Sequence, residues 1–224
     1  MGLQYGLTRG DMVQFINFLN SEALIVFGLS ATWAELIGSV LGVAMVICNI
    51  RQIHWGWPLA FLSALMYALV FRSVQLHGEA VLQIFFCVSA LWGWWQWLRG
   101  GKGGVQTLQP QVIPTSVARK CVAFSVLLTP LTALFLARFT SSGVAFWDAL
   151  PTVLSLVTTY LLAKKYTANW PLWIVVNLIS IGLFAFKGLW LTVGLYAVFA
   201  VMAGVGWHTW LQTMKNLRAK GAAS

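Results

Sequence analysis

Seven apolar runs follow one another between residue 33 and residue 211, and each is bounded by Gly, Pro or charged residues. Each run approaches the roughly 20 residues that a helix needs to cross a bilayer. Two runs open with Trp-Pro, and proline suits the first turn of a helix because its missing N–H would have no partner there. The seven predicted spanning helices are 33–50, 57–73, 79–98, 117–137, 147–163, 171–187 and 189–211.

Two segments fall outside these runs. Residues 12–30 are apolar but are interrupted by polar side chains such as Gln14 and Glu22. We interpret them as a helix that lies on the membrane surface, with an eighth span as the alternative. Residues 100–114 form the one long polar linker of the chain, between the third and fourth runs.

Composition supports a membrane protein. Of the 224 residues, 59% are hydrophobic and only 8% are charged, and the mean hydropathy is +0.80. A soluble domain carries about 25% charged residues, so this chain cannot cover a water-facing surface. The three cysteines are odd in number and lie inside apolar runs, so we expect neither a disulfide framework nor a metal site.

Given seven spans, the charged residues divide unevenly between the two sides of the membrane. Four of the 14 Lys and Arg, with all five acids, fall on one side, and the other ten fall on the opposite side. Basic residues gather in cytoplasmic loops, so we expect a cytoplasmic carboxyl terminus, an external amino terminus and no nucleic-acid partner. The ten basic residues are Arg51, Arg99, Lys102, Arg119, Lys120, Lys164, Lys165, Lys215, Arg218 and Lys220.

The chain also repeats itself at an offset of 113 residues. Trp57-Pro58-Leu59 falls on Trp170-Pro171-Leu172, and Trp94 and Trp97 fall on Trp207 and Trp210. Each repeat holds three predicted spans and one span joins them, so both repeats enter the membrane in the same direction. Parallel repeats of this kind are known in transporters, where the substrate binds between them near the midplane.

The repeat fixes the expected organisation of the chain. We predict an all-helical integral membrane fold of the form three plus one plus three helices. Its parts are an N-terminal segment with the interfacial helix (1–32), the first repeat (33–99), the polar linker with the linking helix (100–146), the second repeat (147–212) and a basic cytoplasmic tail (213–224).

Little in the spans is typical of an enzyme. The acids lie at span ends or outside the spans, and no carboxylate lies in the middle of a span. The three histidines lie near span ends without a ligand-spaced partner, and no serine sits in a nucleophile elbow. We expect no catalytic residue, no metal and no cofactor.

Neutral polar and aromatic side chains are the candidate binding groups. An amide inside a bilayer needs hydrogen-bond partners and should face inward. Gln83 and Tyr196 occupy equivalent positions of the two repeats, which favours a site between them, and Trp173 shares a helix face with Asn177. Amides with aromatic planes suit a planar, weakly hydrated ring that carries hydroxyls. The candidates are Gln83, Asn177, Tyr196, Trp94, Trp173, Trp190, Asn49 and Thr159.

Tryptophan is in excess, with 13 in the chain. Five lie at span ends, where an interfacial belt is the ordinary explanation. The run from Leu91 to Trp97 is too dense for a belt alone. The five belt candidates are Trp33, Trp55, Trp57, Trp147 and Trp170.

Between about residues 33 and 212 the chain resembles the PnuC transporters. The motifs that carry the likeness in the first repeat are Cys48-Asn49-Ile50-Arg51, Gly56-Trp57-Pro58, Leu82-Gln83 and Gly93-Trp94-Trp95-Gln96-Trp97. Those in the second repeat are Asn169-Trp170-Pro171-Leu172-Trp173 with Asn177, Lys187-Gly188-Leu189 and Leu195-Tyr196. The second Trp motif, Gly206-Trp207-His208-Thr209-Trp210, is looser than the first.

The resemblance implies a SWEET-like fold, a homotrimer and facilitated diffusion of nicotinamide riboside across a bacterial inner membrane. Phosphorylation by a cytoplasmic riboside kinase would then trap the substrate. With no span carboxylate or histidine to relay a proton, we expect uncoupled transport. With no basic residue inside the spans, we expect the phosphorylated mononucleotide to be rejected. Two alternatives stay open: a SWEET-type carrier of a sugar or another vitamin, and a membrane enzyme or assembly protein that does not transport.

Overall fold

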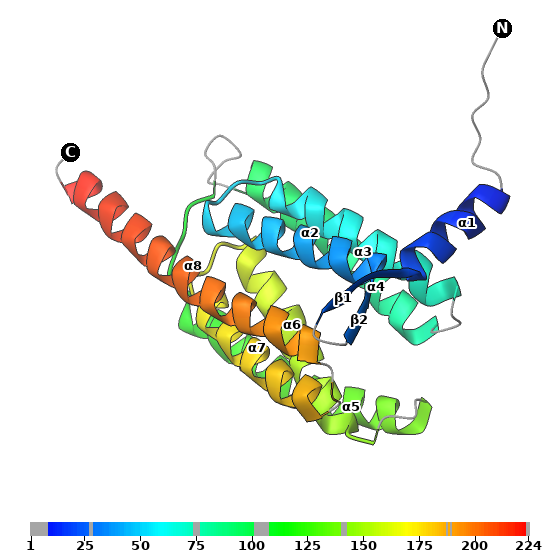
Figure 1. Cartoon of the computed structure of the whole chain (residues 1–224). Coiled ribbons are helices and arrows are strands. Elements are labelled where there is room, and N and C mark those ends of the chain that lie inside the picture. Colours follow the sequence, from blue (N-terminus) through cyan, green and yellow to red (C-terminus); the bar gives the residue numbers. More distant parts are fainter. Residues whose placement is uncertain are drawn as a thin grey trace, which may run out of the picture.

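The computed structural model describes residues 9–26, 29–73, 77–100, 108–139, 143–186, 188 and 190–222. Within these residues the regular structure consists of eight helices and one two-stranded hairpin (Figure 1). Lys187, which opens the motif Lys187-Gly188-Leu189, lies outside the described residues.

Each of the seven predicted runs forms a helix. The helices begin at or close to the predicted starts, because each apolar run opens after charged, Gly or Trp-Pro residues. The last helix continues past the predicted end at residue 211. The seven are α2 (Trp33–Ile50), α3 (Gly56–Ser73), α4 (His77–Arg99), α5 (Thr115–Phe139), α6 (Ala145–Ala163), α7 (Asn169–Phe186) and α8 (Trp190–Ala222).

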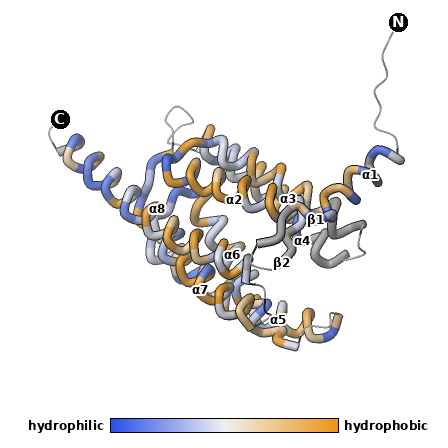
Figure 2. Tube along the Cα trace, viewed as in Figure 1, coloured by the Kyte–Doolittle hydropathy of each residue, from blue (hydrophilic) through white to orange (hydrophobic). Residues whose placement is uncertain are grey.

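Four stretches of described residues are long and apolar enough to cross a membrane: α5, α6, α7 and residues 192–220 of α8. Two apolar stretches of α2 and α3, Leu36–Ile50 and Gly56–Met66, are shorter. Figure 2 shows apolar residues along the bundle and polar residues on the part of α8 that projects beyond it. The chain is a helical, multi-pass membrane protein, and the number of crossings stays a prediction.

The interpretation of residues 12–30 as one helix is wrong in its extent. Helix α1 (Arg9–Asn20) ends where the backbone N–H and hydroxyl of Ser21 both donate to the Phe18 carbonyl. Strands β1 (Glu22–Val26) and β2 (Leu29–Thr32) then pair antiparallel. The β-branched Ile25 and Val26 favour a strand over the surface helix expected there.

The helices of the two repeats occupy matching positions. Helix α7 begins and ends 113 residues after α3, the same separation that joins Gln52 to Lys165. By the same offset α2 corresponds to α6, and α4 to α8. Helices α2, α3 and α4 pack in sequence, as do α6, α7 and α8, and the two groups meet where α2 contacts α8 and where α4 contacts α6 (Figure 1). These two contacts are equivalent to each other under the repeat.

Three loops gather at one end of the bundle, which we call the basic end. Their described residues are 51–55, 108–114 and 164–168, and direct hydrogen bonds connect them. The Lys164 ammonium donates to the Gln96 side chain at 2.9 Å, and the Gln111 side chain donates to the Lys164 carbonyl at 3.0 Å. The basic residues of this end include Arg51, Arg99, Lys164 and Lys165.

Candidate functional site

Four buried tryptophans meet at the basic end, where the two repeats touch. Trp57 and Trp97 of the first repeat cross edge to face at 5.7 Å between ring centroids, and Trp170 and Trp210 of the second repeat do the same at 5.4 Å. Trp97 and Trp210 contact each other across the repeats at 6.2 Å. All four are at most 4% exposed. We call this group the tryptophan cluster.

The cluster is held by hydrogen bonds that also obey the repeat. The Trp97 indole N–H donates to the Leu162 carbonyl at 3.1 Å. The Trp210 indole N–H donates at 3.2 Å to the carbonyls of Asn49 and Ile50. Asn49 and Leu162 are equivalent positions near the ends of α2 and α6. In each repeat, therefore, one indole donates a hydrogen bond to the end of the first helix of the other repeat.

Two equivalent glycines make room for the cluster. A Cβ atom on Gly93 would overlap the Trp57 ring, and one on Gly206 would overlap the Trp170 ring. Rings and helix backbones are therefore in direct contact in both repeats, which a larger residue at either glycine would prevent.

The burial of Trp57 and Trp170 corrects the belt interpretation. They are 4% and 2% exposed, because each ring lies against the glycine of the neighbouring helix rather than toward the bilayer. Trp55 and Trp147, in contrast, are 59% and 54% exposed, as an interfacial position requires.

The loop that follows the first helix of each repeat has one backbone shape. Gln52 and Lys165 occupy equivalent positions and both adopt the left-handed region, with φ of 59° and 52°. The Gln52 N–H donates to the Asn49 carbonyl at 3.1 Å, and the Lys165 N–H donates to the Leu162 carbonyl at 2.9 Å. Non-glycine residues rarely adopt this conformation, so its occurrence twice shows that the surrounding packing imposes it.

Lys165 is buried although it carries an ammonium group. Its side chain is 5% exposed, and the nitrogen lies 4.4 Å from the centroid of the Trp97 ring and 3.5 Å from the Gln52 side-chain oxygen. Removal from water disfavours the charged form, and burial accordingly lowers the Lys165 pKa from 10.5 to about 8. The ammonium therefore remains mostly charged at neutral pH.

A cavity of about 240 Å³ opens beside this ammonium. We call it the basic-end cavity. The Trp94 indole N–H donates to His54 Nδ1 at 3.3 Å, and because an indole nitrogen only donates, this bond leaves His54 Nε2 to carry the proton. The residues that line the cavity are Gln52, His54, Trp97, Leu98, Gln109 and Lys165.

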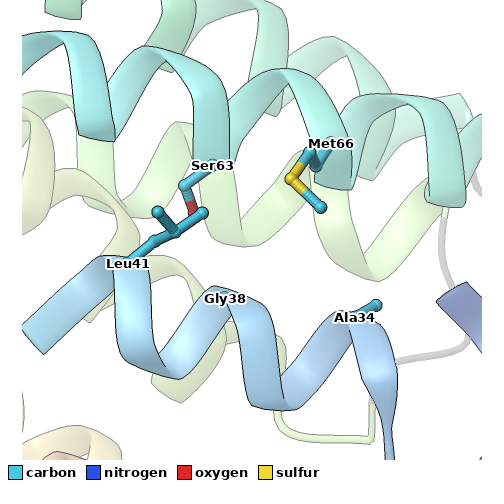
Figure 3. Close-up of a pocket in the computed structure, with 5 residues that line it drawn as sticks. All are labelled: Ala34, Gly38, Leu41, Ser63 and Met66. Carbon is cyan, nitrogen blue, oxygen red and sulfur yellow. The ribbon is translucent and has the colours of Figure 1, made fainter.

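A second recess lies between α2 and α3, where Ala34, Gly38 and Leu41 face Ser63 and Met66 (Figure 3). It has essentially no space for a water molecule. This recess cannot hold a substrate in the described conformation, and none of the eight candidate binding residues lines it.

Four candidates lie close to the tryptophan cluster. Trp94 and Trp173 pack against it, and the Asn49 carbonyl accepts from Trp210. Thr159 lies one turn before the end of α6, where its hydroxyl donates to the Ser155 carbonyl at 2.7 Å and keeps its lone pairs for a ligand.

Three candidates lie deeper in the bundle. Asn177, 4% exposed, is two turns beyond Trp170, which places it about 10 Å along α7 from the cluster. Gln83 and Tyr196 each precede the cluster tryptophan of their own helix by about 20 Å. The Tyr196 ring contacts Phe184 at 5.0 Å between centroids.

Trp190 lies apart from the other candidates. It is the first residue of α8 and is 60% exposed, about 30 Å along the helix from Trp210. The candidates are thus spread along the length of the bundle rather than forming one compact pocket.

The sequence analysis missed Gln52, His54 and Lys165. Lys165 was counted only as a topological charge, and Gln52 and His54 follow a predicted span without a partner nearby in the sequence. The repeat offset, which pairs Gln52 with Lys165, is the signal that could have found these two residues, but it does not point to His54. Within the described residues, no three His, Cys, Asp or Glu side chains gather as a metal site would require.

A family model described as nicotinamide mononucleotide transporter matches residues 32–212. The chain belongs to this family, that of the PnuC transporters. The matched range agrees with the resemblance found in the sequence between about residues 33 and 212. Members and relatives of the family are membrane transporters, and the chain is a transporter rather than an enzyme.

Curated relatives include proteins named for two vitamins. The nicotinamide riboside transporter PnuC of Escherichia coli strain K12 is 24% identical over 214 residues, covering 84% of this chain and 89% of the relative. The riboflavin/roseoflavin transporter RibM of Streptomyces davaonensis is 28% identical over 202 residues, covering 87% and 92%. The nicotinamide riboside transporter PnuC of Neisseria mucosa is 23% identical over 224 residues.

A solved structure, described as the crystal structure of the vitamin B3 transporter PnuC, shares the fold. The TM-score is 0.66 at 22% identity, and the match covers 94% of each chain. At this identity the likeness carries the helical arrangement and not the substrate.

Proposed function

We propose that the chain is a carrier of nicotinamide riboside that works by facilitated diffusion with alternating access. The observation that carries the proposal is the chemistry inside the bundle, where indoles, the buried Asn177 amide and the Thr159 hydroxyl lie, while no described helix carries a carboxylate beyond its first turn. A pyridinium ring carries diffuse charge and gains about 0.5–2 kcal/mol on an aromatic face. A ribose offers hydroxyls to the amides. Curated relatives from Escherichia coli and Neisseria mucosa bear the name of this substrate.

The proposed architecture has two parallel three-helix repeats, α2–α4 and α6–α8, joined by α5. The basic end faces the cytoplasm of a bacterial inner membrane, because basic residues gather on that side. The amino-terminal helix α1 lies on the outer surface of the bilayer. We further propose a homotrimer, as the family resemblance implies.

In this proposal the tryptophan cluster is the closed cytoplasmic side of the path. Trp97 and Trp210 lie in contact between the repeats, and each indole bonds to the opposite repeat. Opening toward the cytoplasm requires the repeats to separate here and both indole bonds to break. Gln83, Asn177 and Tyr196 then lie on the open side of the cluster, with Trp190 at the external entrance.

Transport is proposed to be uncoupled from ion gradients. Glu35, Glu79 and Asp148 all lie in the first turn of their helices, and no acid lies in the middle of α2 to α8. A membrane-embedded proton or ion relay is usually built from such groups. Phosphorylation by a cytoplasmic riboside kinase makes net uptake possible.

Uptake of labelled riboside into proteoliposomes tests the proposal. The label should equilibrate and stop, with or without proton and sodium gradients. Sustained accumulation in vesicles without kinase would show coupling. The phosphorylated mononucleotide should not enter, because its phosphate would have to pass Trp, Asn and Gln side chains without a cation. Entry at a comparable rate would contradict this selectivity.

Riboflavin is the second candidate substrate, because RibM is as similar to the chain as the PnuC relatives are. Its neutral three-ring system would also stack on indoles. Competition by each vitamin against labelled riboside separates the two. Inhibition by riboflavin alone, without uptake of riboside, would assign the carrier to riboflavin.

A further inference from the structure

The basic-end cavity combines one buried cation with neutral hydrogen-bond donors. The Lys165 ammonium lies 3.5 Å from the Gln52 side-chain oxygen, and both residues line the cavity together with His54. The groups come from both repeats, since Gln52 and His54 follow α2 and Lys165 follows α6. A ligand held between them would connect the two repeats at the place where the tryptophan cluster closes the path.

The charge of Lys165 has no carboxylate to balance it. All five acids of the chain lie in the amino-terminal segment or in the first turns of α2, α4 and α6, whose other ends form the basic end. Asp148 opens the helix that Lys165 follows, and the length of that helix places them about 25 Å apart. The partner that the cavity lacks is therefore an anion from outside the chain.

The fold does not need a cation at this position. Gln52 occupies the equivalent position with the same left-handed backbone and the same type of hydrogen bond to the helix end. A neutral amide thus meets the structural demands of the loop. Lys165 replaces it at the cost of burying a charge, which points to a use for the charge.

We propose that the basic-end cavity binds a phosphate group presented from the cytoplasm, with Lys165 and His54 as its principal donors. Phosphate accepts several hydrogen bonds at once, and an ammonium with neighbouring N–H donors is its usual setting. The source of the phosphate, which rests on the proposed function, is the phosphorylated riboside made after uptake. Bound there, it bridges the repeats, keeps the tryptophan cluster closed and slows further uptake.

Binding is measured on the purified full chain in detergent without added lipid, with the mononucleotide and inorganic phosphate as probes and tryptophan fluorescence as the signal. Lys165→Gln should weaken binding about 10- to 100-fold, the effect of losing a charge-assisted hydrogen bond. Lys164→Gln is the matched control, because that ammonium lies outside the cavity, over the Trp92 ring. Equal losses in both variants, or no binding to the wild type, would overturn the proposal.

A second variant guards against a folding defect. His54→Gln keeps an acceptor for the Trp94 indole and should weaken binding of either probe several-fold while the melting temperature stays near that of the wild type. Binding that is insensitive to both Lys165→Gln and His54→Gln would also overturn the site.

Transport assays distinguish the source of the phosphate. Proteoliposomes loaded with mononucleotide should take up riboside more slowly than empty ones, and Lys165→Gln should remove the difference. If anionic vesicles alone produce the slowing, in comparison with phosphatidylcholine vesicles, the soluble source is overturned and the site belongs to a lipid headgroup. If riboside is not transported at all but phosphate binding still depends on Lys165, the proposed function fails and the phosphate site stands.

Discussion

The two repeats share a backbone at the basic end but fill it with different side chains. Gln52 corresponds to Lys165, and both hold the same left-handed turn. A buried amide stands at Asn49 in the first repeat, opposite Gly56, where a Cβ would come within 2.7 Å of its oxygen. In the second repeat the amide stands at Asn169, where the first has Gly56. The comparison shows that tryptophans, glycines and turns keep the shape, while the positions between them have diverged.

The largest predicted effect on stability comes from removing one indole of the tryptophan cluster. Trp210→Ala should lower the free energy of unfolding by about 3–5 kcal/mol, as expected for a fully buried aromatic residue, and Trp97→Ala should cost a similar amount. Thermal unfolding in detergent measures both. Trp207→Ala, on the same helix but 41% exposed, is the control. A large loss for only one of the two would show that one repeat carries the contact.

The paired glycines give a smaller effect of the same kind. Gly93→Ala and Gly206→Ala should each cost about 1–3 kcal/mol, because a new methyl group must displace a tryptophan ring. Gly204→Ala, two residues before Gly206 and with nothing within 4 Å of the new Cβ, should leave the melting temperature nearly unchanged. Unequal losses of stability at Gly93 and Gly206 would show that the two repeats share their backbone but not the packing of tryptophan on glycine.

Lys165 makes the stability of the second repeat depend on pH, whereas the equivalent Gln52 of the first repeat does not titrate. Its pKa is lowered to about 8, so between about pH 8 and the ordinary lysine value the unfolded chain binds a proton that the folded chain does not. The free energy of unfolding should therefore rise with pH across this window. At about 1.4 kcal/mol for each pH unit between these two pKa values, the rise amounts to about 3 kcal/mol.

Melting temperatures of wild type and Lys165→Gln, compared at pH 7 and pH 10, measure this contribution. The variant should be the more stable protein at pH 7, and the difference should shrink toward pH 10. Lys164→Gln should show no such trend. A difference that is constant with pH would mean that Lys165 is not buried as a cation.

The smallest predicted effect concerns the substrate path. Asn177 corresponds to Ala64 in the first repeat, so Asn177→Ala makes the repeats alike at this level. Loss of one hydrogen bond should weaken riboside binding by about 0.5–1.5 kcal/mol, or 2- to 10-fold. Gln83→Leu should act similarly, and Asn216→Ala, on the exposed part of α8, should not. Normal binding by both path variants would remove these residues from the site.

The helices could be predicted because apolar runs end at charge, glycine and Trp-Pro, and these features also end helices in the structure. The hairpin of β1 and β2 could not, since a run as short as Glu22–Val26 does not distinguish a strand from a helix end. The positions of Trp57 and Trp170 beside a helix start look interfacial in sequence. Only the contact with Gly93 and Gly206 reveals that they are buried.

The sequence predicts the chemistry of the candidate binding residues but not how these residues are arranged. Inward amides and indoles follow from the bilayer, which does not satisfy polar groups. The vertical separation of Asn177 from Gln83 and Tyr196 depends on how the helices are aligned along their axes. The role of Lys165 could not be predicted, because two adjacent lysines, Lys164 and Lys165, are typical of an exposed loop. The burial of Lys165 depends on the Trp97 ring, which lies 68 residues earlier in the chain.

The described part of the linker before α5, residues 108–114, is hydrogen-bonded to the second repeat. Gln111 exchanges backbone hydrogen bonds of 3.0 Å with Lys165 and Thr167, and its side chain donates to the Lys164 carbonyl. If transport works by alternating access, as proposed, these hydrogen bonds make residues 108–114 move together with the loop between α6 and α7.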